Sequence, residues 1–328
     1  MIEPASDDQD LRTLVEEFFR TSFATDNPII TEAVRRMLAA GGKRLRPRLT
    51  LLAAEAMGAD ATQHLSLASY MELIHVATLI HDDVVDHAET RRGVNATAVD
   101  FGNRISVLAG DYVFAWIFKN VTASYPHPIP HILSSTLADI TDGEVLQLKA
   151  MGNLDLTVSG YIDIIVKKTA TLFAASAECG AIMAGGSPLR IKALRNFGLY
   201  YGIAFQMRDD LLDMVADEAS LGKPVGSDLR ERKVTLPLIS ALQEGDSEFR
   251  ADVERFFAEA DEDRDRIAKI VSLIGTHGGF EKTEAAIATY IERAKISLAP
   301  LGSVPARSKL NALADALGGG EVPGKRRF

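Results

Sequence analysis

Two short stretches of this sequence carry three aspartates each within otherwise apolar segments. The first is LIHDDVVDHAETRRG, residues 79–93, and the second is FQMRDDLLDM, residues 205–214. In each, the first and last aspartates are four residues apart, so on a helix they share one face. Like charges at that spacing weaken a helix, and a carboxylate in apolar surroundings is costly unless it is paired or binds a metal. One copy would fit a solvated acidic face equally well, but two copies favour a functional role.

The chemistry that suits this pattern is oxygen ligation of Mg²⁺, which is typically held by one or two carboxylates together with substrate phosphates. Two aspartate clusters facing each other across a cleft would hold several Mg²⁺ ions bridged by a diphosphate. The ions would neutralise the carboxylates and the substrate together. The six candidate ligands are Asp82, Asp83, Asp86, Asp209, Asp210 and Asp213.

Polar residues near the aspartates share their helical stripes. His75 lies seven positions before Asp82, and Gln206 lies seven before Asp213, which is nearly two turns in each case. This alignment favours a role at the site, although a lone histidine in an apolar helix is more often a core residue. His81 and His87 lack the alignment and are expected to be structural.

Basic residues cluster where an anion site would need them. GGKRLRP, residues 41–47, joins two glycines to Lys43, Arg44 and Arg46 at the start of a helical stretch. Glycines let backbone N–H groups approach a phosphate, a helix N-terminus favours anions, and arginine forks fit phosphate oxygens. A short basic run alone is as readily a solvated face. Further basic or polar candidates follow at Arg91, Arg92, Lys167, Lys168, Thr169, Lys223 and Lys233. The set predicts two diphosphates, one bound through metal and one by direct positive charge.

The elements that position these residues are predicted to be helices. Long stretches without proline are rich in helix-forming residues, and apolar residues recur at spacings of three and four, as in Leu49, Leu52, Ala53 and Ala56. A sheet is not expected. No change in composition marks a domain boundary. We therefore expect one all-α domain over residues 1–328, with about ten or more helices, a core of about 30–300 and a mobile tail at 317–328.

Composition excludes several classes of function. The net charge of −9 argues against a nucleic-acid binder, which would normally show a basic face. The one cysteine, Cys179, allows no intrachain disulfide and fits a reducing compartment. The sequence shows neither a signal peptide nor a run of about 18 apolar residues. A soluble cytoplasmic protein is expected.

Taken in order, the motifs resemble those of the trans-isoprenyl diphosphate synthases, or polyprenyl synthetases, from about residue 30 to 300. GGKRLRP and the first aspartate motif are followed by KKTATLFAASAECGAI, GIAFQMRDDLLD and GKPVGSDLRERKVTLP. The resemblance implies a helical bundle around a deep apolar cavity, a homodimer, and Mg²⁺ as cofactor. It implies isopentenyl diphosphate and an allylic diphosphate as substrates.

The resemblance also implies roles for individual residues. The six aspartates match positions that bind Mg²⁺ and the allylic diphosphate. Positions for isopentenyl diphosphate are matched by Lys43, Arg46, His75 and Arg92. Positions near the allylic substrate, expected to act in catalysis or binding, are matched by Arg91, Lys168, Thr169, Gln206, Lys223 and Lys233. Two departures stand out: Arg208 could pair with the second aspartates, and Arg232 replaces a common glycine. The basic end GKRRF matches nothing in the family.

Product length is expected to depend on what blocks the cavity beside the first motif. Ala77, five residues before Asp82, leaves the way open where short-chain members carry an aromatic plug. The next large residue on that stripe is Tyr70, which would be a floor or, more simply, a packing residue. Residues 143–157 also resemble the long-chain quinone-tail synthases. A long-chain product is therefore favoured over a farnesyl or geranylgeranyl one, and it implies transient membrane association at release.

Two other functions compete with this one. A class I terpene cyclase also ionises an allylic diphosphate, but usually has a different second metal motif and lacks GGKRLRP. A non-catalytic subunit of a heteromeric synthase would usually lose the aspartates, and here all six remain. The expected enzyme is a prenyltransferase.

Overall fold

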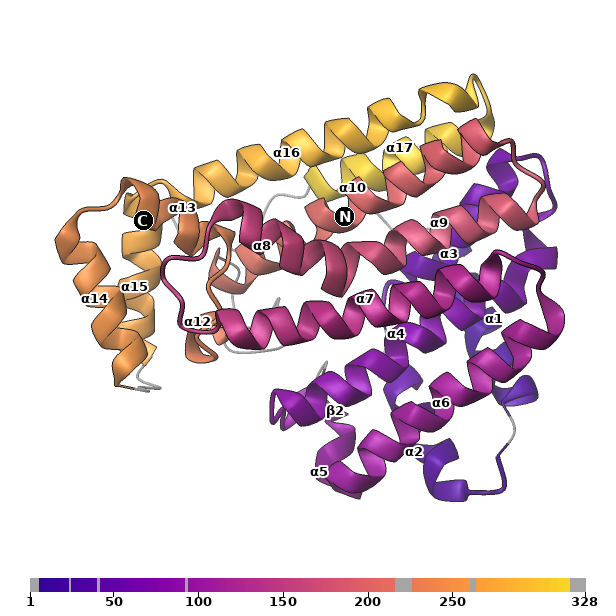
Figure 1. The fold of residues 1–328 in the computed structure, drawn as a ribbon, viewed down its shortest axis with the longest axis horizontal. Helices are drawn as coiled ribbons and strands as arrows, with labels where there is room; N and C mark the ends of the chain where they lie inside the picture. The colour runs from indigo at the N-terminus through magenta and orange to yellow at the C-terminus, as the bar shows by residue number, and fades with distance from the viewer. Residues whose placement is uncertain are drawn as a thin grey trace. The chain divides into compact units, whose positions relative to one another are not determined.

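The computed structural model describes residues 6–23, 25–39, 42–91, 94–215, 226–259 and 264–318. Within these ranges almost every element is a helix (Figure 1). The all-α prediction is confirmed. The described strands are β1 (Thr90–Arg91) and β2 (Val94–Asn95), which pair antiparallel with Arg91 opposite Val94. A ribbon of two residues per strand is too short to leave an alternating pattern in the sequence.

The chain divides into two compact units. Unit 1 comprises Met1–Ser135, Ala175–Arg195 and Ser303–Ala306, and unit 2 comprises Thr136–Ala174, Asn196–Gly302 and Arg307–Phe328. The first aspartate motif and GGKRLRP belong to unit 1, whereas the second aspartate motif belongs to unit 2. The expectation of a single domain over 1–328 stays a prediction.

Unit 1 is organised around the apolar helix that ends at the first aspartate motif. Its elements are α1 (Ser6–Ser22), α2 (Pro28–Ala39), α3 (Leu45–Ala56), η1 (Ala61–His64), α4 (Leu65–Val85), β1, β2, α5 (Thr97–Phe101) and α6 (Asn103–Ser124). Helix α4 packs against α3 and α6 and buries most of its side chains before it ends at the first aspartate motif. Gly110 of α6 permits this packing, because a Cβ there would lie 2.3 Å from Nε2 of His81. His81 also lies 3.0 Å from the Val107 carbonyl oxygen, as expected of a structural histidine.

Unit 2 contains parts of four long helices: α7 (Ile129–Ala150), α9 (Thr171–Met183), α10 (Pro188–Val215) and α17 (Pro305–Gly318). Its other elements are α8 (Val158–Ile165), η2 (Val166–Ala170), α12 (Ser227–Arg230), α13 (Leu236–Glu244), α14 (Ser247–Ala258), α15 (Arg264–Thr276), α16 (Gly279–Ser297) and η3 (Ala299–Leu301). Helices α16 and α17 run beside α10 (Figure 1): the rings of Tyr200 and Tyr290 are 6.2 Å apart, and Arg208 donates to the Leu317 carbonyl.

Close helix packing in unit 2 depends on two glycines of α10. A Cβ at Gly198 would lie 2.4 Å from the carbonyl oxygen of Phe173, and one at Gly202 would lie 2.7 Å from Cα of Ala170. Because neither glycine carries a side chain, α10 lies directly against the segment where η2 passes into α9. This contact brings Gln206 and Asp210 of α10 beside Thr169.

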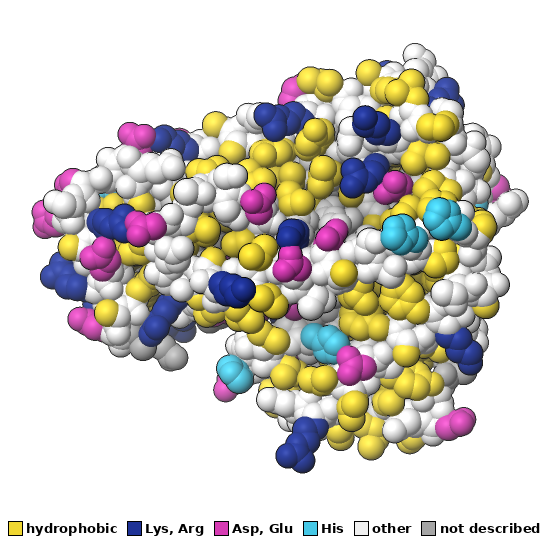
Figure 2. Space-filling model, in the orientation of Figure 1, with side chains coloured by type: hydrophobic (Ala, Val, Ile, Leu, Met, Phe, Trp, Pro, Cys, Tyr) yellow, Lys and Arg dark blue, Asp and Glu magenta, His cyan; other side chains and the backbone are white. Residues whose placement is uncertain are grey.

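Surface features agree with the composition. On the face drawn in Figure 2, acidic and basic side chains are scattered among apolar ones, without one continuous basic patch. Within the described segments, none of the helices combines the length and the apolar character that crossing a bilayer requires. Of the tail expected to be mobile, Leu317 and Gly318 are described; they end α17, and Leu317 is buried. The rest of the tail lies outside the described residues.

Candidate active site

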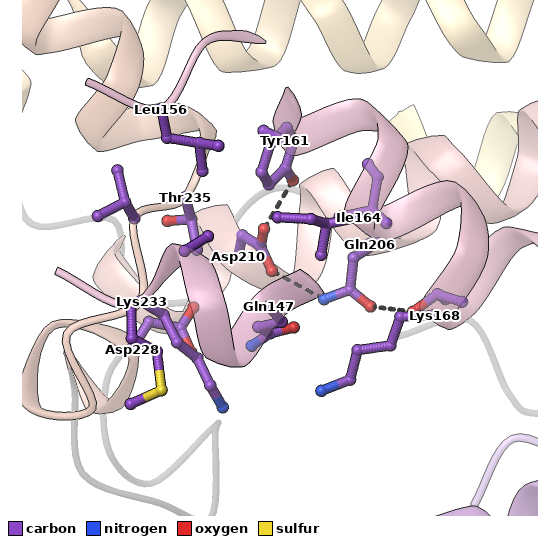
Figure 3. A pocket seen from close by; sticks show the side chains of 15 residues that line it. Gln147, Leu156, Tyr161, Ile164, Lys168, Gln206, Asp210, Asp228, Lys233 and Thr235 are labelled. Atoms are coloured by element: carbon purple, nitrogen blue, oxygen red, sulfur yellow. Dashed lines mark hydrogen bonds between the residues drawn. The ribbon is translucent and has the colours of Figure 1, made fainter. Parts of the chain in front are cut away.

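A pocket of about 120 Å³ in unit 2 gathers several of the predicted site residues (Figure 3). Its polar wall includes Lys168, Thr169, Gln206, Asp210 and Lys233, all of which the sequence had singled out. Residues not predicted from the sequence also line it, among them Gln147, Leu156, Tyr161, Ile164, Asp228 and Thr235. The pocket therefore combines two cationic side chains and carboxylates with an apolar wall.

A chain of hydrogen bonds links the polar side chains of this pocket. Thr169 Oγ1 donates to Gln206 Oε1 at 2.9 Å, and Gln206 Nε2 donates to Asp210 Oδ1 at 2.8 Å. The Tyr161 hydroxyl donates to the other carboxylate oxygen, Oδ2, at 2.6 Å. Figure 3 shows Tyr161 and Gln206 approaching Asp210 from two directions. Both oxygens of this buried carboxylate, whose residue is 5 % exposed, thus accept a side-chain donor.

Burial reinforces the protonated state of Tyr161. Loss of water raises the pKa of the Tyr161 hydroxyl well above its ordinary value, and the neighbouring charge of Asp210 and their hydrogen bond act in the same direction. The hydroxyl therefore stays protonated at physiological pH. It serves Asp210 as a permanent donor.

Lys168 and Thr169 lie in a π-helical turn, η2, between two α-helices. Such turns are rare and frequently occur at functional sites. Gly143 of α7 packs against this turn, because a Cβ at position 143 would lie 2.5 Å from the backbone nitrogen of Lys168. The next residue, Glu144, forms an ion pair of 2.5 Å with the Lys168 ammonium group. Residues of α7 thus fix both the backbone and the charged end of Lys168.

Asp213 holds a turn of the chain. Its carbonyl oxygen accepts from the backbone N–H of Gly226 at 2.8 Å, and its Oδ2 accepts from the N–H of Asp228 at 3.0 Å. It is almost completely buried, whereas Asp209 of the same motif is exposed. The three aspartates of the second motif therefore have three different environments.

The turn that carries Lys233 contains a strained residue. Arg232 has φ of 56°, in the left-handed region that glycine adopts at little cost. Its carbonyl oxygen accepts from the N–H of Gly152 at 2.8 Å, and Lys233 N–H donates to the Asp228 carbonyl at 2.7 Å. The Lys233 ammonium group pairs with Glu231. The backbone of this turn therefore has a glycine-like conformation at an arginine.

The first aspartate motif ends α4 in unit 1. Asp83 is fully buried, and its Oδ1 accepts from Arg91 Nε at 2.7 Å and lies 2.6 Å from Arg91 Nη2. Arg91 is carried by β1, so the short ribbon holds this side chain over the end of the helix. Asp82 and Asp86 are half-buried, and the N–H of Asp86 donates to the Asp82 carbonyl. His75 lies on the same helix and is also half-buried.

The basic side chains of the motif GGKRLRP differ in exposure and in their contacts. Lys43 is exposed and Arg46 is buried. Arg44 is also buried: its Nη1 donates to Glu72 Oε1 at 2.7 Å, and its Nη2 donates to the Leu38 carbonyl at 2.7 Å. Arg44 has φ of 46° at the start of α3. This arginine therefore anchors the motif to α4, which its sequence context did not reveal.

The two residues predicted to control product length, Ala77 and Tyr70, both lie on α4 in unit 1. Ala77 is fully buried in α4. Tyr70 joins an aromatic cluster in which its ring lies 5.5 Å from Phe18, 5.7 Å from Trp116 and 6.2 Å from Tyr125. Burial raises the pKa of Tyr70. These contacts fit the interpretation of Tyr70 as a packing residue.

Two predicted substrate-binding residues, Arg92 and Lys223, lie outside the described residues. Among those described, no group of three or more histidine, cysteine, aspartate or glutamate side chains is arranged to hold a metal ion. The donors present are carboxylate oxygens, the type that Mg²⁺ prefers. Since Mg²⁺ commonly takes only one or two carboxylates and completes its shell with water and substrate phosphates, the residues fit that ion.

Comparison with known proteins gives consistent matches. A family model described as polyprenyl synthetase matches residues 27–274. The chain is 38% identical over 290 residues to octaprenyl diphosphate synthase of Escherichia coli, covering 88% of this chain and 90% of that protein. It is 37% identical over 307 residues to a short chain isoprenyl diphosphate synthase of Methanothermobacter thermautotrophicus, covering 92% and 94% of the two chains. The crystal structure of a decaprenyl diphosphate synthase from Rhodobacter capsulatus superposes with a TM-score of 0.88, at 39% identity over 94% of this chain and 96% of that one.

Proposed function

This chain belongs to the polyprenyl synthetase family, and on that premise we propose that it is a Mg²⁺-dependent trans-polyprenyl diphosphate synthase. It condenses isopentenyl diphosphate head to tail with an allylic diphosphate, and so acts as a prenyltransferase. The observation that carries this proposal is the pocket of unit 2, where Lys168 and Lys233 lie with Asp210 beside an apolar wall. A diphosphate with a hydrocarbon chain needs charged side chains for its diphosphate and an apolar wall for its chain.

The reaction follows from the chemistry of these groups. The C–O bond of the allylic diphosphate breaks, and its electron pair leaves with the diphosphate. Lys168 and Lys233 stabilise the negative charge that develops there. The double bond of isopentenyl diphosphate supplies the pair for the new C–C bond, and loss of a proton, which the released diphosphate accepts, restores a double bond. Apolar neighbours such as Leu156 and Ile164 exclude water, which would quench the allylic cation.

Mg²⁺, when bound, would neutralise the diphosphate and favour its departure. Its proposed ligands are the carboxylates of both motifs, Asp82, Asp83, Asp86, Asp209, Asp210 and Asp213. Several of these carboxylates also hold other groups: Asp83 holds Arg91, Asp213 holds the turn at residues 226–228, and Asp210 accepts from Tyr161 and Gln206.

Isopentenyl diphosphate is proposed to bind in unit 1, through Lys43, Arg46, His75 and Arg92. Exposed Lys43 lies just before α3 and buried Arg46 lies in its first turn, which supports a shared anion site. Arg91 would bring positive charge to the end of the first aspartate motif, where Asp83 fixes its position. Lys223 is proposed to join the allylic diphosphate.

We propose a long-chain product. Ala77 leaves space five residues, about 7.5 Å along the helix, before Asp82, and Tyr70 follows about 18 Å from Asp82. Relatives of both classes resemble this chain: the Escherichia coli protein is named for an octaprenyl product, and the Methanothermobacter protein for short-chain products. The alanine at position 77 supports the longer product in this chain. A homodimer in the cytoplasm, with transient membrane contact as the apolar product leaves, completes the proposal.

The decisive experiment incubates the purified protein with labelled isopentenyl diphosphate, Mg²⁺ and single allylic primers, and then sizes the products. We expect chains longer than twenty carbons. Failure to elongate any primer would reject the catalytic proposal, and an Asp82→Ala variant that keeps its thermal stability serves as the inactive control. Products of only fifteen or twenty carbons would reject the long-chain assignment alone.

The product-length argument has its own test. Replacing Ala77 by Phe places an aromatic ring about 7.5 Å from Asp82 along α4, so the variant should release shorter chains than the wild type. Chromatography of the dephosphorylated products measures the shift. An unchanged product distribution would show that the growing chain does not pass Ala77.

A further inference from the structure

We propose that Tyr161 is a positioning residue of this enzyme: its hydroxyl orients the Asp210 carboxylate for the cation that binds with the diphosphate. The inference rests on the proposed function, which supplies the cation and the diphosphate. Tyr161 belongs to none of the sequence motifs and was not among the expected site residues. It comes from α8, whereas Asp210 comes from α10, 49 residues further along the chain.

The contacts of Asp210 support this role. The hydroxyl of Tyr161 donates to Oδ2 at 2.6 Å, and Gln206 Nε2 donates to Oδ1 at 2.8 Å. One donor on each oxygen fixes the plane of the carboxylate as well as its direction. A carboxylate has about four acceptor positions, so these two bonds do not exhaust its capacity to bind a cation. A ligand that is held in place before the cation arrives loses less conformational freedom on binding.

Burial separates Asp210 from its neighbour in the motif. Asp209 is exposed, so water can reach its carboxylate. Asp210 is 5 % exposed, and Tyr161 is 2 % exposed, so side-chain donors must largely replace water there. The short bond to Tyr161 is charge-assisted, which makes it one of the stronger hydrogen bonds of the site.

The simpler interpretation is that Tyr161 only fills the core. A phenylalanine would fill the same space without a buried hydroxyl that needs a partner. A purely structural tyrosine would influence stability, but it would not influence the affinity for a cation. The two interpretations therefore differ in a measurable property.

The experiment compares the full-length wild type with Tyr161→Phe, which removes only the hydroxyl. Tyr200→Phe is the control, because Tyr200 is a half-buried tyrosine of unit 2 that contacts Tyr290 on α16 and does not line the pocket. Mn²⁺ serves as the probe in place of Mg²⁺, with inorganic diphosphate present. Electron paramagnetic resonance measures free Mn²⁺, and thermal unfolding measures stability. Elongation by the wild type is recorded in parallel.

We expect Tyr161→Phe to weaken Mn²⁺ binding about tenfold, since hydrogen bonds to charged groups are among the more valuable ones, while Tyr200→Phe keeps wild-type affinity. A third variant carries 4-aminophenylalanine, a weaker donor, at position 161. Its Mn²⁺ affinity should lie between those of the wild type and Tyr161→Phe. Equal Mn²⁺ affinity in wild type and Tyr161→Phe would overturn the proposal. If the Phe variant does not fold, the amino variant decides: reduced affinity supports the role and unchanged affinity overturns it.

The design separates this inference from the proposed function. If the wild type elongates a primer and Tyr161→Phe binds Mn²⁺ normally, only the positioning role is wrong. If the wild type binds Mn²⁺ with diphosphate but does not elongate, the proposed function is wrong.

Discussion

Replacement of Gly143 by alanine should damage catalysis more than it damages stability. A Cβ at this position would lie 2.5 Å from the backbone nitrogen of Lys168 and 2.9 Å from its Cα. Ordinary contact begins near 3.4 Å, so the π-helical turn η2 must move away by about 0.9 Å (3.4 − 2.5). The closest clash is with backbone atoms of Lys168, so rotation of a side chain cannot relieve it.

The expected magnitudes follow from that displacement. Overpacking typically costs about 1–3 kcal/mol, while the better helix propensity of alanine returns about 1 kcal/mol, so the net loss of stability is about 0–2 kcal/mol. The same shift would displace Thr169 and disturb its 2.9 Å bond to Gln206. Displacements of about 1 Å at an active site can cost about a hundredfold in rate, so kcat should fall by about one to two orders of magnitude.

The assay pairs kcat for elongation with chemical denaturation of the same samples. Gly318→Ala is the control: it lies at the end of α17, where the nearest atom is the flexible tip of Ile291, 3.2 Å from the added Cβ. This control should stay close to wild type in both measurements. A Gly143→Ala enzyme with kcat within twofold of wild type would refute the argument that α7 fixes the position of η2.

Two further predictions concern strain and buried charge. Arg232→Gly should raise the free energy of unfolding by up to about 1 kcal/mol. The reason is that φ of 56° costs an L-residue more free energy than glycine loses through its greater freedom in the unfolded chain. Equilibrium urea denaturation measures this change, and a destabilised variant would contradict the strain argument. Glu72→Gln should cost about 3 kcal/mol, the low end for breaking a buried pair, since Glu16 remains 3.7 Å from Arg44. Removing Glu17 from the exposed pair with Arg20 should cost much less, and equal losses from both pairs would contradict the role of burial.

Much of this molecule could be predicted from its sequence. Apolar spacing of three and four, with long stretches free of proline, correctly indicated an all-α protein. Among the site residues, the sequence aligned Gln206 with Asp213, whereas the structure bonds it to Asp210. Lys168, Thr169 and Lys233 line the same pocket. These inferences depend on helix periodicity or on motifs whose order in the chain is itself informative.

What the sequence did not reveal depends on contacts between distant segments. Tyr161 resembles any core aromatic in its helix, and only its contact with Asp210 distinguishes it. One signal was available, since Tyr161 lies seven residues, nearly two turns, before Lys168. Arg44 resembled its neighbours Lys43 and Arg46, but its partner Glu72 lies 28 residues away. No periodicity encodes such pairs, because the partners belong to different elements.

The π-helical turn makes the site depend on the length of the chain as well as on its composition. Tyr161 precedes η2 and Thr169 lies within it, yet both bond to the chain of side chains on α10. Deleting one residue between them would rotate everything that follows by about 100° relative to Tyr161. The helix itself could tolerate that loss and become regular. The two bonds to α10 could not both survive, so in this segment a single-residue deletion should be more harmful than most substitutions.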